Sequence, residues 1–280
     1  MGQKLAVFDI DGTIANHGVL DQGALAGIRH LQSQGYITTL CTGRGYRTLK
    51  LALGDHFDEV VSDKALLILE HGTKITDKLG NVVFAEYLGS EEINHIIDFL
   101  RANISIVKII WSHPENPSNK DLMWCINASV MTQESPKRSG YANLFTGSFG
   151  QLRTLLLEEK LTSVGAKMNP HVQVHNLKLA FTRSPINVIF QDGNIDFLRN
   201  NTNKGLAILY LMKHLQCEYG DVLVAGNAIN DVEMLNLAVG KRILVGPEVE
   251  REALVGYLSE QADLVHVATP HALGNYLQRL

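Results

Sequence analysis

Two carboxylates one residue apart, Asp9 and Asp11, are the first residues of this chain whose types and spacing could do chemistry. They follow an apolar run, residues 5–8, that is too short for a helix and is typical of a buried parallel strand. In an open α/β sheet, ligands bind just beyond the carboxyl ends of the strands, and Gly12 would let the chain turn sharply there. A spacing of two is also the shortest that aims two side chains of an extended segment the same way. The pattern predicts a metal site or an acid–base pair, although Asp and Gly are equally common in helix caps and turns.

A second expected strand, residues 36–41, also ends on polar residues, in this case Thr42, Gly43 and Arg44. The carboxyl ends of parallel strands meet at the same edge of a sheet, so Thr42 is expected to lie close to Asp9. Helix capping is the alternative use of a threonine at such a position.

Strands and helices alternate over roughly the first quarter of the chain and again after residue 203. This order predicts an α/β fold, a doubly wound, Rossmann-like parallel sheet with right-handed crossovers. Asp21 and Thr269 are placed to cap helices of this region. Between the two stretches, many strands and few helices indicate a smaller α+β domain. We therefore predict a core of residues 1–83 and 191–280 with an inserted domain of residues 84–190.

The composition is that of an ordinary globular protein, with 45% hydrophobic residues and a formal net charge of −4. No basic excess favours nucleic acid as a partner, and no stretch approaches the roughly 18 apolar residues that a membrane span needs. Cys41, Cys125 and Cys217 give neither a disulfide framework nor zinc-ligand spacing. With no leader evident before the first strand, we expect a cytoplasmic protein, whose oligomeric state the sequence leaves open.

Four short motifs stand at expected strand ends and helix starts. They are Asp9-x-Asp11-Gly12-Thr13, Thr42-Gly43-Arg44, Lys204-Gly205 and Gly226-Asn227-x-x-Asn230-Asp231. In order and spacing they resemble the haloacid dehalogenase (HAD) superfamily of hydrolases, and most closely its Cof-type phosphatases, which carry a cap domain between the second and third motifs. The resemblance covers both predicted core segments, whereas residues 84–190 match the cap in position and size only.

The resemblance implies catalysis through a covalent intermediate. Asp9 would be the nucleophile that forms an aspartyl-phosphate, and Asp11 would protonate the leaving oxygen and later deprotonate the attacking water. Thr42 would donate its hydroxyl to a phosphate oxygen, and Lys204 would neutralise charge on the phosphoryl group and on Asp9. The residues implied to bind phosphate are Asp9, Thr42, Gly43, Arg44, Lys204 and Asn230.

The cofactor that the resemblance implies is Mg²⁺. It would be held by the carboxylate of Asp9, by the backbone carbonyl of Asp11 and by the last motif, in which Asn227 and Asp231 are the candidates. Relatives usually have Asp where this chain has Asn227, and an amide oxygen carries no net charge, so weaker metal binding is expected. Asp231 would act through water or by orienting Lys204.

A second departure from the family pattern is His71, which precedes a glycine where relatives usually have Asn. It would alter substrate recognition or be a solvated loop histidine. His171 and His175 are four residues apart, but their segment reads as extended and no third ligand is evident, so a metal site is not expected there. Trp111 and Trp124 are expected to pack the inserted domain, with lining of the substrate pocket as the alternative.

The sequence therefore predicts a phosphoric monoester hydrolase, a Mg²⁺-dependent phosphatase that acts on a small phosphorylated metabolite such as a sugar or polyol phosphate. A phosphomutase or phosphoryl transferase shares the same motifs and is one alternative. The other is a weakly active, phosphate-binding regulatory protein, which Asn227 makes credible.

Overall fold

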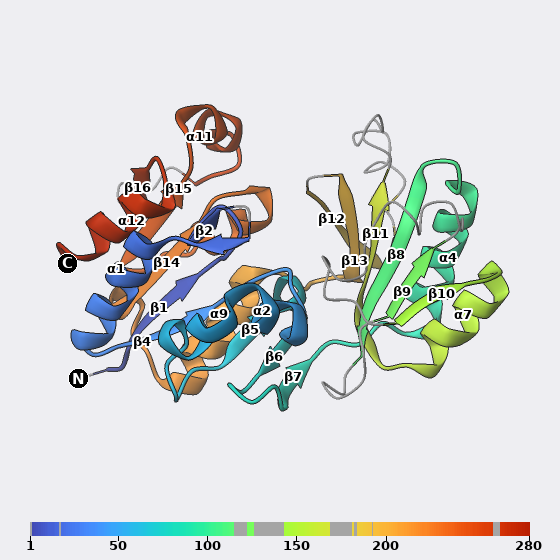
Figure 1. The fold of residues 1–280 in the computed structure, drawn as a ribbon, viewed down its shortest axis with the longest axis horizontal. Helices are drawn as coiled ribbons and strands as arrows, with labels where there is room; N and C mark the ends of the chain where they lie inside the picture. Colours follow the sequence, from blue (N-terminus) through green and yellow to red (C-terminus); the bar gives the residue numbers. More distant parts are fainter. Residues whose placement is uncertain are drawn as a thin grey trace. The chain divides into compact units, whose positions relative to one another are not determined.

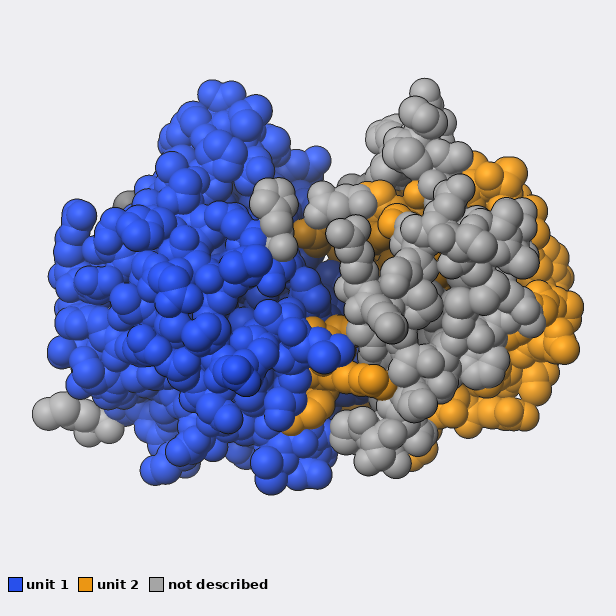
Figure 2. Space-filling view, viewed as in Figure 1, with its two compact units in different colours: residues 1–44, 49–84, 203–280 blue, residues 45–48, 85–202 orange. Residues whose placement is uncertain are grey.

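The structure is a computed structural model that describes residues 2–16, 18–114, 122–125, 143–168, 181, 184–191, 193–259 and 264–280. The chain forms two compact units (Figure 1 and Figure 2). The first contains residues 1–44, 49–84 and 203–280, and the second contains residues 45–48 and 85–202. Each unit has a sheet and a hydrophobic core of its own. Within the described part of the chain, no helix is long and apolar enough to cross a membrane.

The first unit is built on a five-stranded sheet in the order β16-β15-β14-β1-β4, and every neighbouring pair is parallel. Its strands are β1 (Lys4–Phe8), β4 (Tyr36–Leu40), β14 (Val222–Gly226), β15 (Lys241–Val245) and β16 (Leu264–Val267). Phe8 of β1 is paired with Leu40 of β4 and with Ala225 of β14, so these three strands end at one edge. The predicted doubly wound parallel sheet is confirmed.

The helices that alternate with these strands begin where the sequence indicates. The carboxylate of Asp21 accepts the N–H of Ala24 at 3.0 Å, and the hydroxyl of Thr269 accepts the N–H of Ala272 at 3.1 Å. Each side chain thus satisfies a helix N–H that has no partner within its own helix. The helices are α1 (Gln22–Ser33), α2 (Tyr46–Leu53), α3 (Phe57–Val60), α9 (Lys204–Leu215), α10 (Val232–Leu235), α11 (Glu248–Val255) and α12 (Pro270–Leu277).

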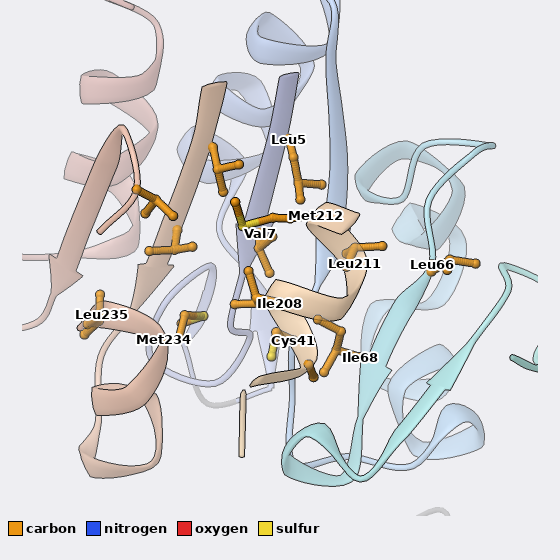
Figure 3. Packing of buried hydrophobic residues seen from close by; sticks show 14 of the residues in the cluster. Leu5, Val7, Cys41, Leu66, Ile68, Ile208, Leu211, Met212, Met234 and Leu235 are labelled. Carbon is orange, nitrogen blue, oxygen red and sulfur yellow. The ribbon is translucent and has the colours of Figure 1, made fainter. Parts of the chain in front are cut away.

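Helix α9 covers one face of the sheet (Figure 3). Leu5 and Val7 of β1 are fully buried in the same hydrophobic cluster as apolar side chains of α9. The α9 residues of this cluster include Ile208, Leu211 and Met212. Side chains alternate along a strand, so Ala6 and Phe8, also fully buried, point to the opposite face. Burial on both faces fixes β1 and the start of the loop that follows it.

Smaller elements complete the first unit. Strands β6 (Lys74–Thr76) and β7 (Val82–Ala85) form a three-stranded sheet with β5 (Leu67–Leu69). Strand β5 meets the end of β4 through an isolated parallel bridge between Cys41 and Ile68. The remaining short elements are β2 (Ala15–Asn16), β3 (Val19–Leu20), η1 (Gly54–His56), η2 (Glu70–Gly72), η3 (Tyr219–Asp221) and η4 (Ile229–Asp231).

The second unit has a six-stranded sheet in the order β10-β9-β8-β11-β13-β12. Helices α4 and α7 bury apolar side chains in the cluster that this sheet shares with them. Trp124 is buried in that cluster, as expected for a packing residue, and the ring of Trp111 lies against Gly165, where an added Cβ would come within 2.1 Å of it. The elements are α4 (Ser90–Ala102), β8 (Val107–Pro114), β9 (Leu122–Cys125), β10 (Asn143–Thr146), α7 (Phe149–Glu158), β11 (Leu161–Met168), β12 (Ile186–Gln191) and β13 (Asn194–Arg199).

The unit boundary differs from the expected one on the C-terminal side. We expected the core to resume at residue 191, whereas β13 pairs with both β11 and β12, and the second unit extends to Thr202. The role of this unit as a cap stays a prediction. His171 and His175 lie outside the described residues.

Candidate active site

Asp9 lies directly after β1 and is buried, with 5% of its surface exposed. Its N–H donates to the carbonyl of Ala225 at 2.9 Å, which continues the ladder between β1 and β14 by one residue. Oδ1 accepts a hydrogen bond from Lys204 Nζ at 2.6 Å, and Oδ2 accepts one from Thr13 Oγ1 at 3.3 Å. The sheet therefore holds the backbone of Asp9, while Thr13 of the following turn and Lys204 of α9 fix the orientation of its carboxylate.

The turn after Asp9 needs a glycine for two reasons. Gly12 has a φ of +89°, which side-chain-bearing residues rarely adopt. A Cβ there would also lie 2.1 Å from Nδ2 of Asn227. The side chain of Asn227 thus packs against this turn, and its Oδ1 lies 3.2 Å from the hydroxyl of Thr13.

Lys204 is the first residue of α9 and is 1% exposed. Its ammonium group donates to Asp9 and to Oδ1 of Asp231, each at 2.6 Å. The other oxygen of Asp231, Oδ2, accepts the backbone N–H groups of Asn227 and Ala228 at 2.9 and 3.0 Å. Both oxygens of this fully buried carboxylate are therefore engaged in holding Lys204 and the loop after β14.

Burial and charge shift the pKa values of this cluster. Burial, aided by the nearby carboxylate of Asp231, raises the pKa of Asp9 from 3.8 to about 7, and Lys204 opposes that rise. Burial alone would lower the pKa of Lys204, but the carboxylates of Asp231 and Asp9 outweigh it and raise that pKa. Two carboxylates thus share one firmly charged lysine, so a further positive charge beside Asp9 would stabilise its ionised form.

The loop after β4 lies beside the loop after β1, as the shared edge predicts. Cys41 donates its N–H to the carbonyl of Phe8 at 2.8 Å, and Thr42 follows, 1% exposed. Arg44 then reaches Asp11 with two parallel hydrogen bonds, Nε to Oδ2 and Nη2 to Oδ1, each 2.7 Å long. The two motifs are therefore joined by a direct ion pair.

His71 is part of this edge, and the alternative of a solvated loop histidine is wrong. Its side chain is buried, and a Cβ on Gly43 would lie 2.4 Å from the imidazole. The backbone N–H of His71 donates to the carbonyl of Thr42 at 3.0 Å. Glu70 and His71 have φ values of 50° and 59°, so two consecutive non-glycine residues adopt the left-handed conformation. Such backbone strain is typical of functional sites.

The sequence reasoning missed a buried ion pair behind this segment. Lys74 Nζ lies 2.7 Å from Oε1 of Glu70, and both side chains are almost fully buried. A buried charge requires a partner, so a Glu and a Lys four residues apart directly after the apolar run 65–69 are the signal that could have revealed it. The expected phosphate-binding residue Asn230 is also buried, and its Oδ1 has no hydrogen-bond partner among the described residues.

The side chains near Asp9 fit an oxygen-preferring cation. Asp9 Oδ2 and Asn227 Oδ1 both approach the hydroxyl of Thr13, at 3.3 and 3.2 Å, so the two oxygens point toward a common region. Carboxylate, amide and carbonyl oxygens are the ligands that Mg²⁺ prefers. In the described residues, no group of three or more His, Cys, Asp or Glu side chains could hold a metal ion. The oxygens of Asp9 and Asn227 are thus of the kind that Mg²⁺ prefers, but only one of these two side chains carries a charge.

A cluster of buried carboxylates and one lysine lies at the carboxyl edge of the central strands of the parallel sheet. α/β proteins with such sheets bind their ligands at this edge. Residues 6–246 match the family model of haloacid dehalogenase-like hydrolases, so the chain belongs to this family. The prediction of a HAD-type hydrolase of the Cof type is confirmed.

Individual relatives are distant but cover nearly the whole chain. The chain is similar to the HMP-PP phosphatase of Cronobacter sakazakii, with 24% identity over 274 residues that cover 92% of both proteins. It is also similar to the HMP-PP phosphatase of Serratia proteamaculans, with 24% identity over 286 residues, 98% of this chain and 94% of that protein.

Two solved structures share the fold. One is a sugar phosphatase of HAD subclass IIB, with a TM-score of 0.76, 15% identity, and coverage of 99% of this chain and 98% of the other. The second, a protein of Thermotoga maritima, has a TM-score of 0.73 and 17% identity, with coverage of 100% of this chain and 98% of the other.

Proposed function

We propose that this protein is a phosphatase that hydrolyses the phosphate monoester of a small metabolite, with Asp9 as its nucleophile. The observation that carries the proposal is the position of Asp9 at the end of the central strand, buried and held by Lys204 at 2.6 Å. Membership of the hydrolase family and the phosphatases among its relatives support the activity. Phosphate monoesters hydrolyse very slowly in water, so the site must supply a nucleophile, charge neutralisation and a proton donor.

The reaction has two steps. In the first, an oxygen of Asp9 bonds to phosphorus while the bond to the leaving oxygen breaks, and Asp11 gives that oxygen its proton. Lys204 neutralises charge on Asp9 and on the phosphoryl group, and Thr42 donates its hydroxyl. In the second, water attacks phosphorus, Asp11 takes a proton from it, and Asp9 is released. Asp231 positions Lys204, because its oxygens are engaged by that lysine and by two backbone N–H groups.

We assign Mg²⁺ to Asp9, the backbone carbonyl of Asp11 and Asn227. When bound, the ion would hold Asp9 ionised and neutralise phosphoryl charge. The raised pKa of Asp9 supports a role for the ion in keeping this carboxylate ionised, since a carboxylate that titrates near pH 7 is partly protonated at neutral pH. Phosphate binding by Gly43, Arg44 and Asn230 is part of the same proposal.

The substitution Asp9→Asn tests the nucleophile. It removes the attacking oxyanion while keeping the side-chain shape, so turnover of a panel of phosphomonoesters with Mg²⁺ should fall below detection while the variant still unfolds in one cooperative thermal transition. Asp55→Asn makes the same chemical change at an exposed position and should leave turnover intact. Substantial hydrolysis by a cleanly folded Asp9→Asn variant would refute the assignment. A wild-type protein that binds phosphate without any turnover would favour the regulatory alternative raised by Asn227.

For the substrate we propose a sugar or polyol phosphate, a class supported by the name of one solved neighbour, a sugar phosphatase. The relatives named HMP-PP phosphatase make that substrate the second candidate. The core supplies phosphate chemistry alone, so we assign discrimination between leaving groups to the predicted cap, whose continuous segment in the structure is residues 85–202. Exchanging this segment for that of a relative should transfer substrate preference, measured as a ratio of kcat/KM values. A preference that stayed with the core would contradict the assignment.

A further inference from the structure

The buried ion pair between Glu70 and Lys74 has no part in the chemistry proposed above. Lys74 Nζ donates to Oε1 of Glu70 at 2.7 Å, and the side chains of Lys74 and Glu70 are 5% and 0% exposed. Removing two charges from water costs about as much as their attraction returns, so such a pair adds little stability compared with apolar residues of the same size. A fixed conformation of the segment that carries the pair is a gain that would account for it.

The ion pair spans a strained turn, η2. Lys74 is the first residue of β6 and is paired with Leu69, the last residue of β5, so the chain reverses over residues 70–73. Within this reversal, Glu70 and His71 have φ values of 50° and 59°, which cost free energy in residues other than glycine. The pair thus joins the first strained residue to the strand beyond the turn, and its loss would let the turn relax.

The turn η2 is hydrogen-bonded to the loop after β4. The N–H of Glu70 donates to the carbonyl of Arg44 at 3.2 Å, and the N–H of His71 donates to the carbonyl of Thr42 at 3.0 Å. In a planar trans peptide, the N–H and the C=O point in opposite directions. The N–H of Gly43 shares its peptide group with the Thr42 carbonyl and therefore points away from η2. This N–H has no hydrogen-bond partner within the described part of the chain, so it is a donor available to an oxyanion.

The same turn contacts the start of α9. Gly72 has a φ of +98°, and a Cβ there would lie 2.3 Å from the carbonyl oxygen of Asn203 and 3.1 Å from the backbone nitrogen of Lys204. The turn therefore touches the loop that carries Thr42 and also the residue whose ammonium group holds Asp9. A shift of η2 would reach both.

We propose that the ion pair between Glu70 and Lys74 is a positioning device for phosphate binding: it holds η2 in its left-handed conformation, and η2 aims the N–H of Gly43 at the incoming phosphoryl group. This inference rests on the proposed phosphatase function, in which Gly43 belongs to the phosphate site. Glu70 and Lys74 are positioning residues, because they act through the backbone of η2 and of the loop after β4.

Replacing each partner with Met tests the proposal, because the two substitutions change the charge in opposite directions. Lys74→Met and Glu70→Met should each weaken the binding of inorganic phosphate about tenfold, since a displaced donor loses a hydrogen bond to a charged group. Calorimetric titration of the full-length protein measures this, with Mg²⁺ held constant and at a temperature at which each variant is folded. An effect of charge alone would weaken binding in Lys74→Met and tighten it in Glu70→Met, and would overturn the proposal.

Two further variants separate positioning from a loss of stability. Leu277→Ala removes a fully buried side chain from α12, which packs against α1, and should lower the melting temperature without changing phosphate affinity. Glu70→Met/Lys74→Met leaves no unpaired buried charge, so its melting temperature should be close to that of the wild type. Its phosphate affinity should nevertheless stay about tenfold lower, because the directional contact is gone. Wild-type affinity in this double variant would overturn the proposal, and the double variant decides the question even where a single variant fails to fold.

The outcomes distinguish this inference from the proposed function. Turnover by the wild type, with unchanged phosphate affinity in the Met variants, would refute the positioning role and leave the phosphatase proposal standing. A wild-type protein that neither binds phosphate nor hydrolyses any phosphomonoester would refute both. Steady-state kinetics supply a second readout: kcat/KM should fall about tenfold in the double variant and stay unchanged in Leu277→Ala.

Discussion

Replacing Asn227 with Asp would show how strongly one missing charge limits this site. The amide oxygen of Asn227 lies 3.2 Å from Thr13 Oγ1, which also lies 3.3 Å from Asp9 Oδ2. Aspartate has nearly the same shape, so Asn227→Asp places a second carboxylate toward the region that Asp9 faces without rebuilding the loop. The expected result is tighter Mg²⁺ binding, because ligand charge strongly tunes affinity for hard cations.

The magnitude follows from Coulomb's law. A carboxylate at position 227 adds one unit of negative charge to the site. Such a charge and a unit positive charge about 5 Å away attract each other by about 3 kcal/mol at an effective dielectric constant of about 20. Asn227 is half-buried, and solvent screening reduces this value, so we expect a net gain of about 1.4 kcal/mol, which is about tenfold in Kd. Without metal, the new charge repels Asp9 and should lower the unfolding free energy by about 1 kcal/mol.

Two assays measure these effects: calorimetric titration with Mg²⁺, and thermal unfolding with and without Mg²⁺. A tenfold tighter site should add about 1.4 kcal/mol to the stabilisation by Mg²⁺ at saturating concentration. Gln34→Glu adds the same charge at an exposed position just before β4, at the far end of that strand from the site, and should leave the titration unchanged. Coincident Mg²⁺ titrations of Asn227→Asp and the wild type would refute Asn227 as a ligand.

Three further outcomes follow from the contacts around Asp9. Asp231→Asn should lower the unfolding free energy, measured in urea, by about 3–5 kcal/mol, because Lys204 loses a fully buried partner. A weaker Mg²⁺ affinity at unchanged stability would instead make Asp231 a metal ligand. In EDTA, the unfolding free energy should fall as pH rises from about 4 to about 7. Folding raises the pKa of Asp9 from 3.8 to about 7, so the folded form binds that proton more tightly than the unfolded form does. The Asp9→Asn variant should lack this part of the pH dependence. Gly43→Ala should destabilise the protein by about 1–3 kcal/mol in the same urea assay, because its Cβ would lie 2.4 Å from the ring of His71; an unchanged midpoint would show that the ring moves freely.

Much of the core could be predicted from the sequence because local and long-range signals agree there. The apolar run before Asp9 becomes β1, and the capping residues Asp21 and Thr269 begin α1 and α12. The structure brings Asp9 and Lys204 into contact although they are 195 residues apart. Parallel strands align their carboxyl ends, so motifs at those ends meet whatever the chain length between them.

Other features could not be predicted because nothing local encodes them. The alternation of β13 is the same whichever sheet it joins, so its pairing with β11 and β12 moved the unit boundary past residue 191. The burial of His71 depends on left-handed backbone at two residues that usually avoid it. Arg44 and Asp11 were both expected at the site, but their contact with each other depends on side-chain directions that the motif spacing does not specify.

The ion pairs also suggest why an amide at position 227 suits a protein that must admit an anion. The side chains that meet at this edge are three carboxylates, of Asp9, Asp11 and Asp231, and two cations, of Lys204 and Arg44. With all of them ionised, this cluster already carries an excess negative charge, and a phosphate dianion must enter against it. An aspartate at position 227 would double that excess and would make phosphate binding depend more strongly on prior binding of a cation. If Asn227 binds the metal as proposed, its amide would therefore shift the balance from metal affinity toward anion entry.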